Sequence, residues 1–192
     1  MGSEMCIRDR SRVQGPEAVT QYNIAYKYFN VLNMAFVIVL TPFWSAFTDA
    51  YTKNDYVWMR NVLEKLEKLW LLCIPVLALM LLCSDFLYQW WIGDSVSVSF
   101  SLSVYMAIYV LCQTGGNVYM FLVNGTSKVR LQLIAYLLFA LISIPLMEYC
   151  CEHYGIEGIL IVPASVFALQ ACIGRMQILR ILNGTAKGIW LK

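Results

Sequence analysis

The sequence carries little charge for its length. Only 14% of its 192 residues are Asp, Glu, Lys or Arg, whereas a soluble domain of average composition carries about 25%. The net charge is +2, and there is no basic patch with interleaved aromatic residues, so we expect no nucleic-acid partner. A chain that is poor in charge and 60% hydrophobic belongs with membrane proteins rather than with soluble domains.

Histidine is nearly absent as well. The single histidine, His153, follows the adjacent thiols Cys150 and Cys151, and this set lacks the ligand spacing of a zinc site. Most other cysteines lie inside apolar runs, where packing is their usual role. With no acidic pair and no serine–histidine arrangement, the sequence predicts no metal, no cofactor and no enzymatic activity.

Long apolar runs are what the sequence has in abundance. The clearest lie at 31–40, 69–82, 131–146 and 156–171, and each reaches the length of a bilayer-spanning helix, about 20 residues, once its flanks are added. We therefore predict an all-α fold, a multi-pass transmembrane helical bundle of about five spans. The predicted spans are 28–50, 69–91, 98–123, 129–149 and 156–182.

Local signals mark the ends of these spans. Gly15-Pro16 precedes the first helix, and proline is well placed at a helix start. Asn124-Gly125 and Asn183-Gly184 are typical helix stops. The second span ends in three aromatic residues that predict an interfacial belt: Tyr88, Trp90 and Trp91.

The positive charges alternate between the two sides of this layout. The connections after spans one, three and five, together with the adjoining span ends, hold most of them: Lys53, Arg60, Lys65, Lys68, Lys128, Arg130, Arg175, Arg180, Lys187 and Lys192. The connections after spans two and four hold none. Because basic loops stay inside, the pattern predicts a cytoplasmic C-terminus.

The segment 56–68 has a different character. Apolar residues recur in it at helical spacing, and Glu64 and Lys68 form an i,i+4 pair. One interpretation is an amphipathic helix lying at the cytoplasmic interface. The other is a solvated extension of the second span.

The first ten residues do not resemble the rest. Residues 1–10, MGSEMCIRDR, match the translated end of a common transposase sequencing adapter. We expect them to be an artefact, to be set aside before the fold is considered. Residues 11–192 would then form one C-terminal transmembrane lobe of a protein that extends upstream.

Polar residues inside the predicted spans are the candidate site. Four are uncharged and two are basic: Asn30, Asn33, Gln113, Asn117, Lys27 and Arg175. Uncharged polar groups in a membrane usually hold helices together, and a basic residue near a span end commonly snorkels. The alternative is that these side chains line a hydrated cavity and bind a substrate.

Several segments together resemble one known family. They are Gly15-Pro-Glu-Ala-Val, Tyr22-Asn-Ile-Ala-Tyr-Lys-Tyr-Phe, Thr41-Pro-Phe-Trp-Ser-Ala-Phe-Thr-Asp-Ala-Tyr, Phe121-Leu-Val-Asn-Gly-Thr-Ser-Lys-Val-Arg-Leu-Gln and Gly155-Ile-Glu-Gly-Ile. In order and spacing they resemble the O-antigen and capsular polysaccharide flippases of the multidrug, oligosaccharidyl-lipid and polysaccharide exporter superfamily. The resemblance covers 11–192.

The resemblance implies a lobe and a cargo. The chain would be the second lobe of a two-lobe transporter in the bacterial inner membrane, surrounded by membrane lipids and partnered by a missing N-terminal lobe. The cargo would be an undecaprenyl-pyrophosphate-linked oligosaccharide. Lys27 and Arg175 would be the cations that meet its pyrophosphate and sugars.

Other functions stay open. A drug/cation antiporter of the same superfamily would need an intramembrane carboxylate, but the acids considered lie at span edges: Asp49, Asp85, Asp94 and Glu148. A multi-span enzyme of polysaccharide biosynthesis would need a partner for His153. A structural membrane protein would need neither.

Overall fold

The computed structural model describes residues 15–93, 98–186 and 188–191. Their elements are α2 (Gly15–Thr52), α3 (Tyr56–Leu82), α4 (Ser84–Ile92), α5 (Phe100–Gly125), α6 (Arg130–Tyr154), the 3₁₀ turn η2 (Gly155–Glu157), α7 (Gly158–Leu182) and η3 (Gly188–Leu191). No strand occurs within these ranges, which confirms the predicted all-α class. The expected adapter residues 1–10 lie outside the described residues.

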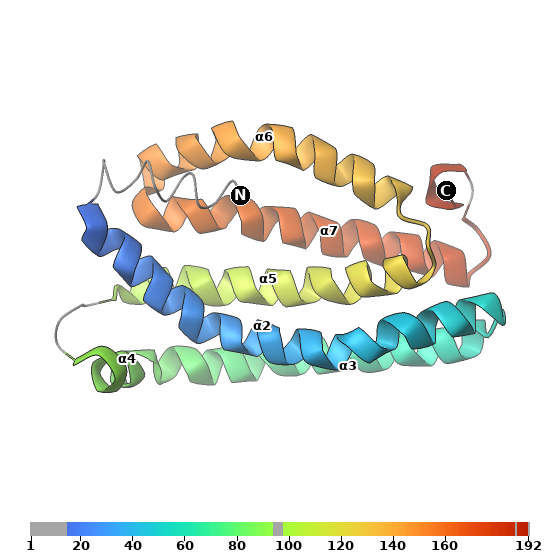
Figure 1. Cartoon of the computed structure of the whole chain (residues 1–192), viewed down its shortest axis with the longest axis horizontal. Coiled ribbons are helices and arrows are strands. Elements are labelled where there is room, and N and C mark those ends of the chain that lie inside the picture. Colours follow the sequence, from blue (N-terminus) through green and yellow to red (C-terminus); the bar gives the residue numbers. More distant parts are fainter. Residues whose placement is uncertain (1–14, 94–97, 187, 192) are drawn as a thin grey trace.

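The helices form a bundle around α5 (Figure 1). The α2–α3 pair packs on one side of α5 and α7 packs on the other, with α6 against α7. In the most apolar stretch of α5, 67% of the residues are buried inside the bundle. In the corresponding stretch of α2, only 17% are buried. The third span of the sequence is therefore the central helix, and the apolar outer faces of the others are left to lipid.

Small residues let the helices approach α5 closely. A Cβ added at Gly116 would lie 3.1 Å from the carbonyl oxygen of Phe167 on α7. A Cβ added at Gly174 would lie 2.6 Å from Cβ of Tyr119 on α5. Side chains at these two positions would force α5 and α7 apart, so the glycines set the spacing of this helix pair.

The bundle has a basic end. The α2–α3 turn, the α5–α6 connection and the C-terminal 3₁₀ turn lie together at one end (Figure 1). Arg60 Nη2 at the start of α3 donates to Asn183 Oδ1 at the end of α7, 2.7 Å away. At the opposite end, Ser101 donates to Glu157. The fold thus gathers the cations of three connections on one side, as the alternating charges predict.

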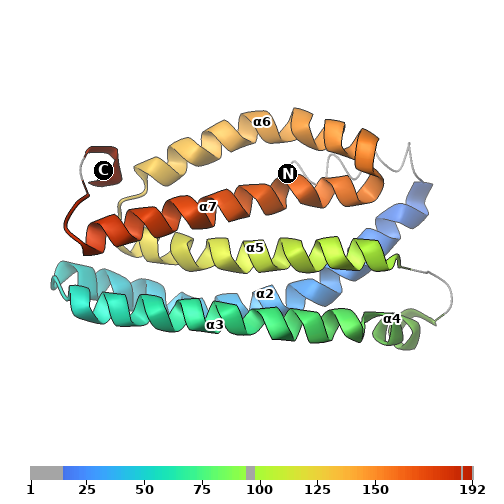
Figure 2. The ribbon, with the colours of Figure 1, turned by 180° about the vertical axis from the view of Figure 1, so that it is seen from behind.

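Several stretches suit a membrane. Three helical stretches are long and apolar enough to span one, or four if α3 and α4 count together as one bent span. The third of these stretches, Arg130–Leu182, contains both α6 and α7, which run side by side in opposite directions (Figure 2). The coarse prediction of a membrane protein with several apolar helices is supported.

The second predicted span, 69–91, is not one straight helix. It contains Cys83, where the chain bends by 56° between α3 and α4. Tyr88 is not part of an aromatic belt: it is buried, and its hydroxyl lies 3.2 Å from Ser103 Oγ on α5. Phe86, Trp90 and Trp91 remain exposed on α4.

The segment 56–68 does not form a separate helix. It is the first half of α3, the second of the two interpretations, and it continues without a break to Leu82. Asp55 caps the helix by accepting a bond from the Trp58 backbone N–H at 3.0 Å. Its apolar face is buried inside the bundle rather than left for an interface: Met59, Val62, Leu63 and Leu66.

The predicted stops differ in detail. α7 ends at Leu182, and Gly184 has φ +66°, so the Asn183-Gly184 stop is confirmed. Gly125, in contrast, is still helical. A Cβ there would lie 3.1 Å from Cβ of Phe47 on α2, so this glycine serves close packing rather than a turn.

Candidate functional site

The three predicted asparagines form a chain of side-chain amides between α2 and α5. Asn33 Nδ2 donates to Asn30 Oδ1 at 3.2 Å, and Asn117 Nδ2 donates to Asn33 Oδ1 at 3.0 Å. Asn117 is only 8% exposed. The second bond joins two helices across 84 residues of sequence, which is the helix-holding role that polar groups commonly have in membranes.

Gln113 lies one turn from Asn117 on the same side of α5. Its Oε1 is buried and has no hydrogen-bond partner among the residues that the structure describes. Tyr109 lies one turn further, and at i, i+4 spacing these three side chains share a helix face. The buried amide oxygen is an acceptor that a bound water or a polar ligand would satisfy.

Tyr109 also lines a groove between α2 and α6. The groove has a volume of about 580 Å³ and draws its walls from α2, α5, α6 and α7: Tyr22, Asn23, Tyr26, Tyr109, Tyr136, Phe139, Ala140, Ser143, Met147, Ile159, Val162, Pro163, Val166 and Phe167. The rings of Tyr22 and Tyr26 stack with centroids 6.1 Å apart. Four tyrosines within an apolar wall give the groove ring faces together with phenolic hydroxyls.

Arg175 lies in a second place. Its Nε is 3.1 Å from Glu67 Oε1 on α3, and the same oxygen accepts a bond of 2.7 Å from the Tyr119 hydroxyl on α5. The Glu67 side chain is 25% exposed and that of Arg175 is 57% exposed. Three helices therefore meet at one carboxylate, which neutralises the guanidinium within the bundle.

A cavity of about 180 Å³ adjoins this ion pair. It is lined by Glu67, Trp70, Gly115, Val118, Tyr119, Ala171, Cys172 and Arg175. The indole of Trp70 is held in place by a 3.1 Å bond from Nε1 to the Leu111 carbonyl oxygen. The cavity thus has a fixed aromatic wall and a charged rim.

The six predicted residues do not form one site. Asn117 and Tyr119 are two residues apart on α5, about 200° around the helix, so the asparagine chain and the Arg175 ion pair face opposite sides of it. Lys27 is exposed on α2. The structure brings Asn30, Asn33 and Asn117 together and places Arg175 elsewhere.

Glu67 and the groove tyrosines were not among the predicted site residues. The helical period of 56–68 places Glu67 among solvated charges, and only packing against α7, 108 residues away, reveals its role. A sequence signal did exist for two tyrosines, because Tyr22 and Tyr26 are spaced i, i+4 near the start of a span.

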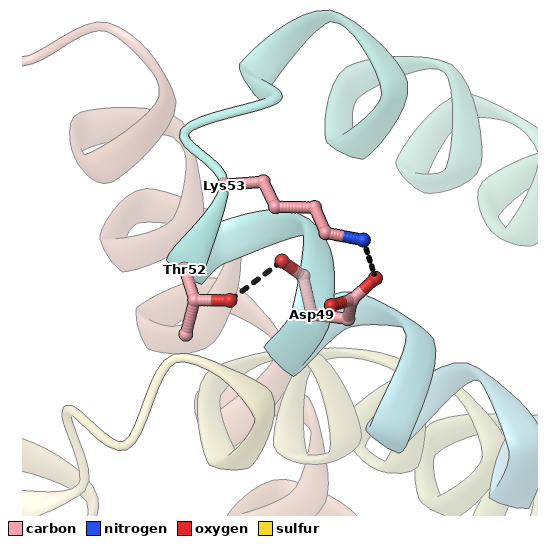
Figure 3. Close-up of polar contacts among 3 residues, drawn as sticks. All are labelled: Asp49, Thr52 and Lys53. Carbon is pink, nitrogen blue, oxygen red and sulfur yellow. Dashed lines mark hydrogen bonds and ion pairs between the residues drawn. The ribbon is translucent and has the colours of Figure 1, made fainter.

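Three of the four acids considered for cation coupling, Asp49, Asp85 and Glu148, lie on the surface. Asp49 Oδ2 is 2.7 Å from Lys53 Nζ, and its backbone carbonyl accepts a bond from Thr52 (Figure 3). Asp85 and Glu148 are exposed, and Asp94 lies outside the described residues. Within the described ranges, no group of three or more His, Cys, Asp or Glu residues could hold a metal ion.

Comparisons with known proteins identify no relative. No protein-family model, no curated protein and no solved structure matches the chain.

Proposed function

We propose that this chain is a membrane lobe of a transporter that carries a lipid-linked oligosaccharide across the bacterial inner membrane. The observation that carries the proposal is the groove of about 580 Å³ in a bundle of apolar helices. Aromatic ring faces with hydroxyl and amide groups suit a cargo that is both ringed and polar. The resemblance of 11–192 to polysaccharide flippases supports the same cargo class.

In this proposal the chain provides one side of a transport path. Transporters of this kind alternate access by rocking one helical bundle against another around a central site. The lobe would contribute the tyrosine groove and the Gln113 oxygen, and the cations Lys27 and Arg175 would meet the cargo outside this groove, Arg175 from the opposite side of α5. A second lobe would supply the opposing wall, and the basic end would face the cytoplasm.

The test is export in a strain that lacks its own flippase. Residues 11–192 alone should reach the inner membrane without restoring surface polysaccharide, whereas the complete upstream reading frame should restore it. In that full frame, Arg175→Gln and Lys27→Gln should each lower export about tenfold or more, the effect of losing one charge-assisted hydrogen bond. Lys53→Gln, at the exposed surface pair, is the matched control.

The outcomes separate the parts of the proposal. Export restored by residues 11–192 alone would overturn the two-lobe reading. Full export by both neutralised variants, at normal protein level, would remove Lys27 and Arg175 from the transport path.

A drug/cation antiporter is the second candidate, and Glu67 is the observation that favours it. This carboxylate is largely buried in α3, where a cation-coupling acid is expected, although Arg175 neutralises it. An antiporter would show proton- or sodium-driven efflux of cationic dyes that Glu67→Gln abolishes. A flippase would show no such efflux.

A further inference from the structure

The first half of α6, residues 130–144, forms one wall of the tyrosine groove but is not enclosed by the bundle. Most of the groove-lining residues of α6 belong to this half, from Tyr136 to Ser143. Among the described residues of α6, only Met147 and Cys150 are buried, and both lie in the second half. The groove is therefore bounded by the part of α6 that the other helices cover least.

Both ends of α6 are fixed. At the outer end, Gly158 packs so closely against α6 that an added Cβ would overlap the carbonyl oxygen of Cys150. At the basic end, Gln177 Nε2 on α7 donates to the Lys128 carbonyl oxygen at 2.7 Å, just before α6 begins. Between these two anchors the helix bows away from α7 (Figure 1).

One side chain provides the polar attachment of the first half. The Tyr136 hydroxyl donates to Met120 Sδ on α5 at 3.6 Å and lies in hydrogen-bonding reach of the Gln170 side-chain amide on α7. Ser143 bonds to a carbonyl of its own helix, and among the described residues no other side chain of 130–144 bonds to another helix. Because a thioether sulfur is a weak acceptor, this attachment is a weak one.

The packing behind Tyr136 is incomplete. A cavity of about 20 Å³ lies between α5, α6 and α7, lined in part by Tyr136, Gln170 and Gly174. The Oε1 atom of Gln170 is buried and has no hydrogen-bond partner among the residues that the structure describes. A buried acceptor without a partner costs free energy, and the walls of a void lose dispersion contacts. The position of α6 against α7 is therefore not strongly favoured.

Pro145 supplies a point of bending between the two halves. It lies inside α6, and a proline lacks the N–H that would bond to the carbonyl of the residue four before it, here Leu141. Sharp bends in helices occur mostly at such positions. A bend at Pro145 moves residues 130–144 while Met147 and Cys150 stay packed.

We propose that α6 is a movable wall of the groove: its first half bends outward at Pro145, and Tyr136 is the latch that holds it closed. The movement takes place within one lobe and adds to the rocking of two lobes against each other. The outer face of this half can move into lipid because it is apolar, with Leu133, Leu137 and Leu141 exposed. The inference deepens the proposed function and rests on it for the reason to open, which is the admission of a lipid-anchored cargo from the bilayer.

Removing the latch should shift the first half of α6 outward. Tyr136→Phe deletes only the hydroxyl, and the loss of an interhelical bond of average strength in a membrane raises the ratio of open to closed α6 about threefold. Tyr149→Phe is the matched control: it deletes the same atom from the second half of α6, where the Tyr149 ring packs on His153, and should change nothing. Ala135→Leu overfills the cavity that Ala135 lines and should hold most molecules open.

The experiment measures distances by double electron–electron resonance in the full 192-residue chain, without native cysteines and reconstituted in lipid nanodiscs. Spin labels at the exposed residues Val31 on α2 and Leu137 on α6 report movement of the first half of α6. A second pair, at Val31 and the exposed Glu148, reports the second half. Tyr136→Phe and Ala135→Leu should both lengthen the first distance and leave the second unchanged.

The inference is wrong if the first distance is unchanged in Tyr136→Phe. It is also wrong if both distances lengthen together, because α6 would then move as one rigid helix. Equal unfolding temperatures of Tyr136→Phe and Tyr149→Phe show that both are folded. The assay contains no cargo, so its failure leaves the transport proposal standing, and a failed export assay leaves the movement of α6.

Discussion

The hydrogen bond between Asn33 and Asn117 allows the helix-holding role of the polar residues to be measured. Asn117→Ala removes the donor of a 3.0 Å bond and leaves Asn33 Oδ1 without it. Interhelical hydrogen bonds in membranes average about 0.6 kcal/mol in double-mutant cycles and reach about 1.7 kcal/mol. Since Asn117 is 8% exposed, we expect a coupling energy in the upper half of that range.

The three asparagines should rank in a definite order. Asn33→Ala breaks both bonds of the chain and should lower the free energy of unfolding most. Asn117→Ala breaks the bond between helices and should follow. Asn30→Ala breaks only a 3.2 Å bond within α2 and should cost least.

The assay is equilibrium unfolding in mixed micelles, with both single variants and the Asn33→Ala/Asn117→Ala double variant. Thr41→Ala is the matched control, because the Thr41 hydroxyl bonds only to the carbonyl of Val37 on its own helix, at 2.8 Å, as far as the described contacts go. A coupling energy below about 0.3 kcal/mol, the scatter of independent sites, would refute the helix-holding reading. The side-chain amides of Asn33 and Asn117 would then be available to bind a ligand in a cavity.

Three further outcomes follow from the fold. In a chain without native cysteines, a cysteine at Asp85 on α4 should be labelled from outside the cell and one at Lys53 only after permeabilisation; the reverse would refute the orientation. Gly174→Ala should destabilise the chain by about 1–3 kcal/mol in a thermal unfolding assay, because its Cβ would lie 2.6 Å from Cβ of Tyr119. Unchanged stability would show that α5 and α7 can move apart without cost. Tyr88→Phe should lower unfolding stability by about 0.5–1.5 kcal/mol through loss of its hydroxyl contact with α5, and a neutral effect would return Tyr88 to an interfacial role.

The sequence predicted the helices well because long apolar runs depend only on local composition. It could not predict the break at Cys83, since no proline or glycine marks it, whereas Pro75 lies inside α3 without ending it. The existence of polar residues in the spans was also predictable.

Their grouping was not predictable, because it depends on which helix faces which. In the sequence, Glu67 is indistinguishable from the other charges on a solvated helix face. Only the packing of α7 beside α3 shows that it pairs with Arg175. The two sides of α5 likewise separate Asn117 from Arg175, although both were expected in one site. Whether any of the six predicted residues binds a substrate stays a prediction.

The bend between α3 and α4 bears on how the lobe would respond to bilayer thickness. α3 has 27 residues, about 40 Å at ~1.5 Å per residue, whereas the hydrocarbon core is about 30 Å thick. A straight continuation through α4 would worsen that mismatch, and the 56° turn avoids it. Because Trp90 is 79% exposed, α4 would lie in the headgroup layer with this indole at the membrane–water interface. A thinner membrane would then be met by tilting of α3 about Cys83, so lipid chain length would change the geometry at the end of the bundle opposite the basic end.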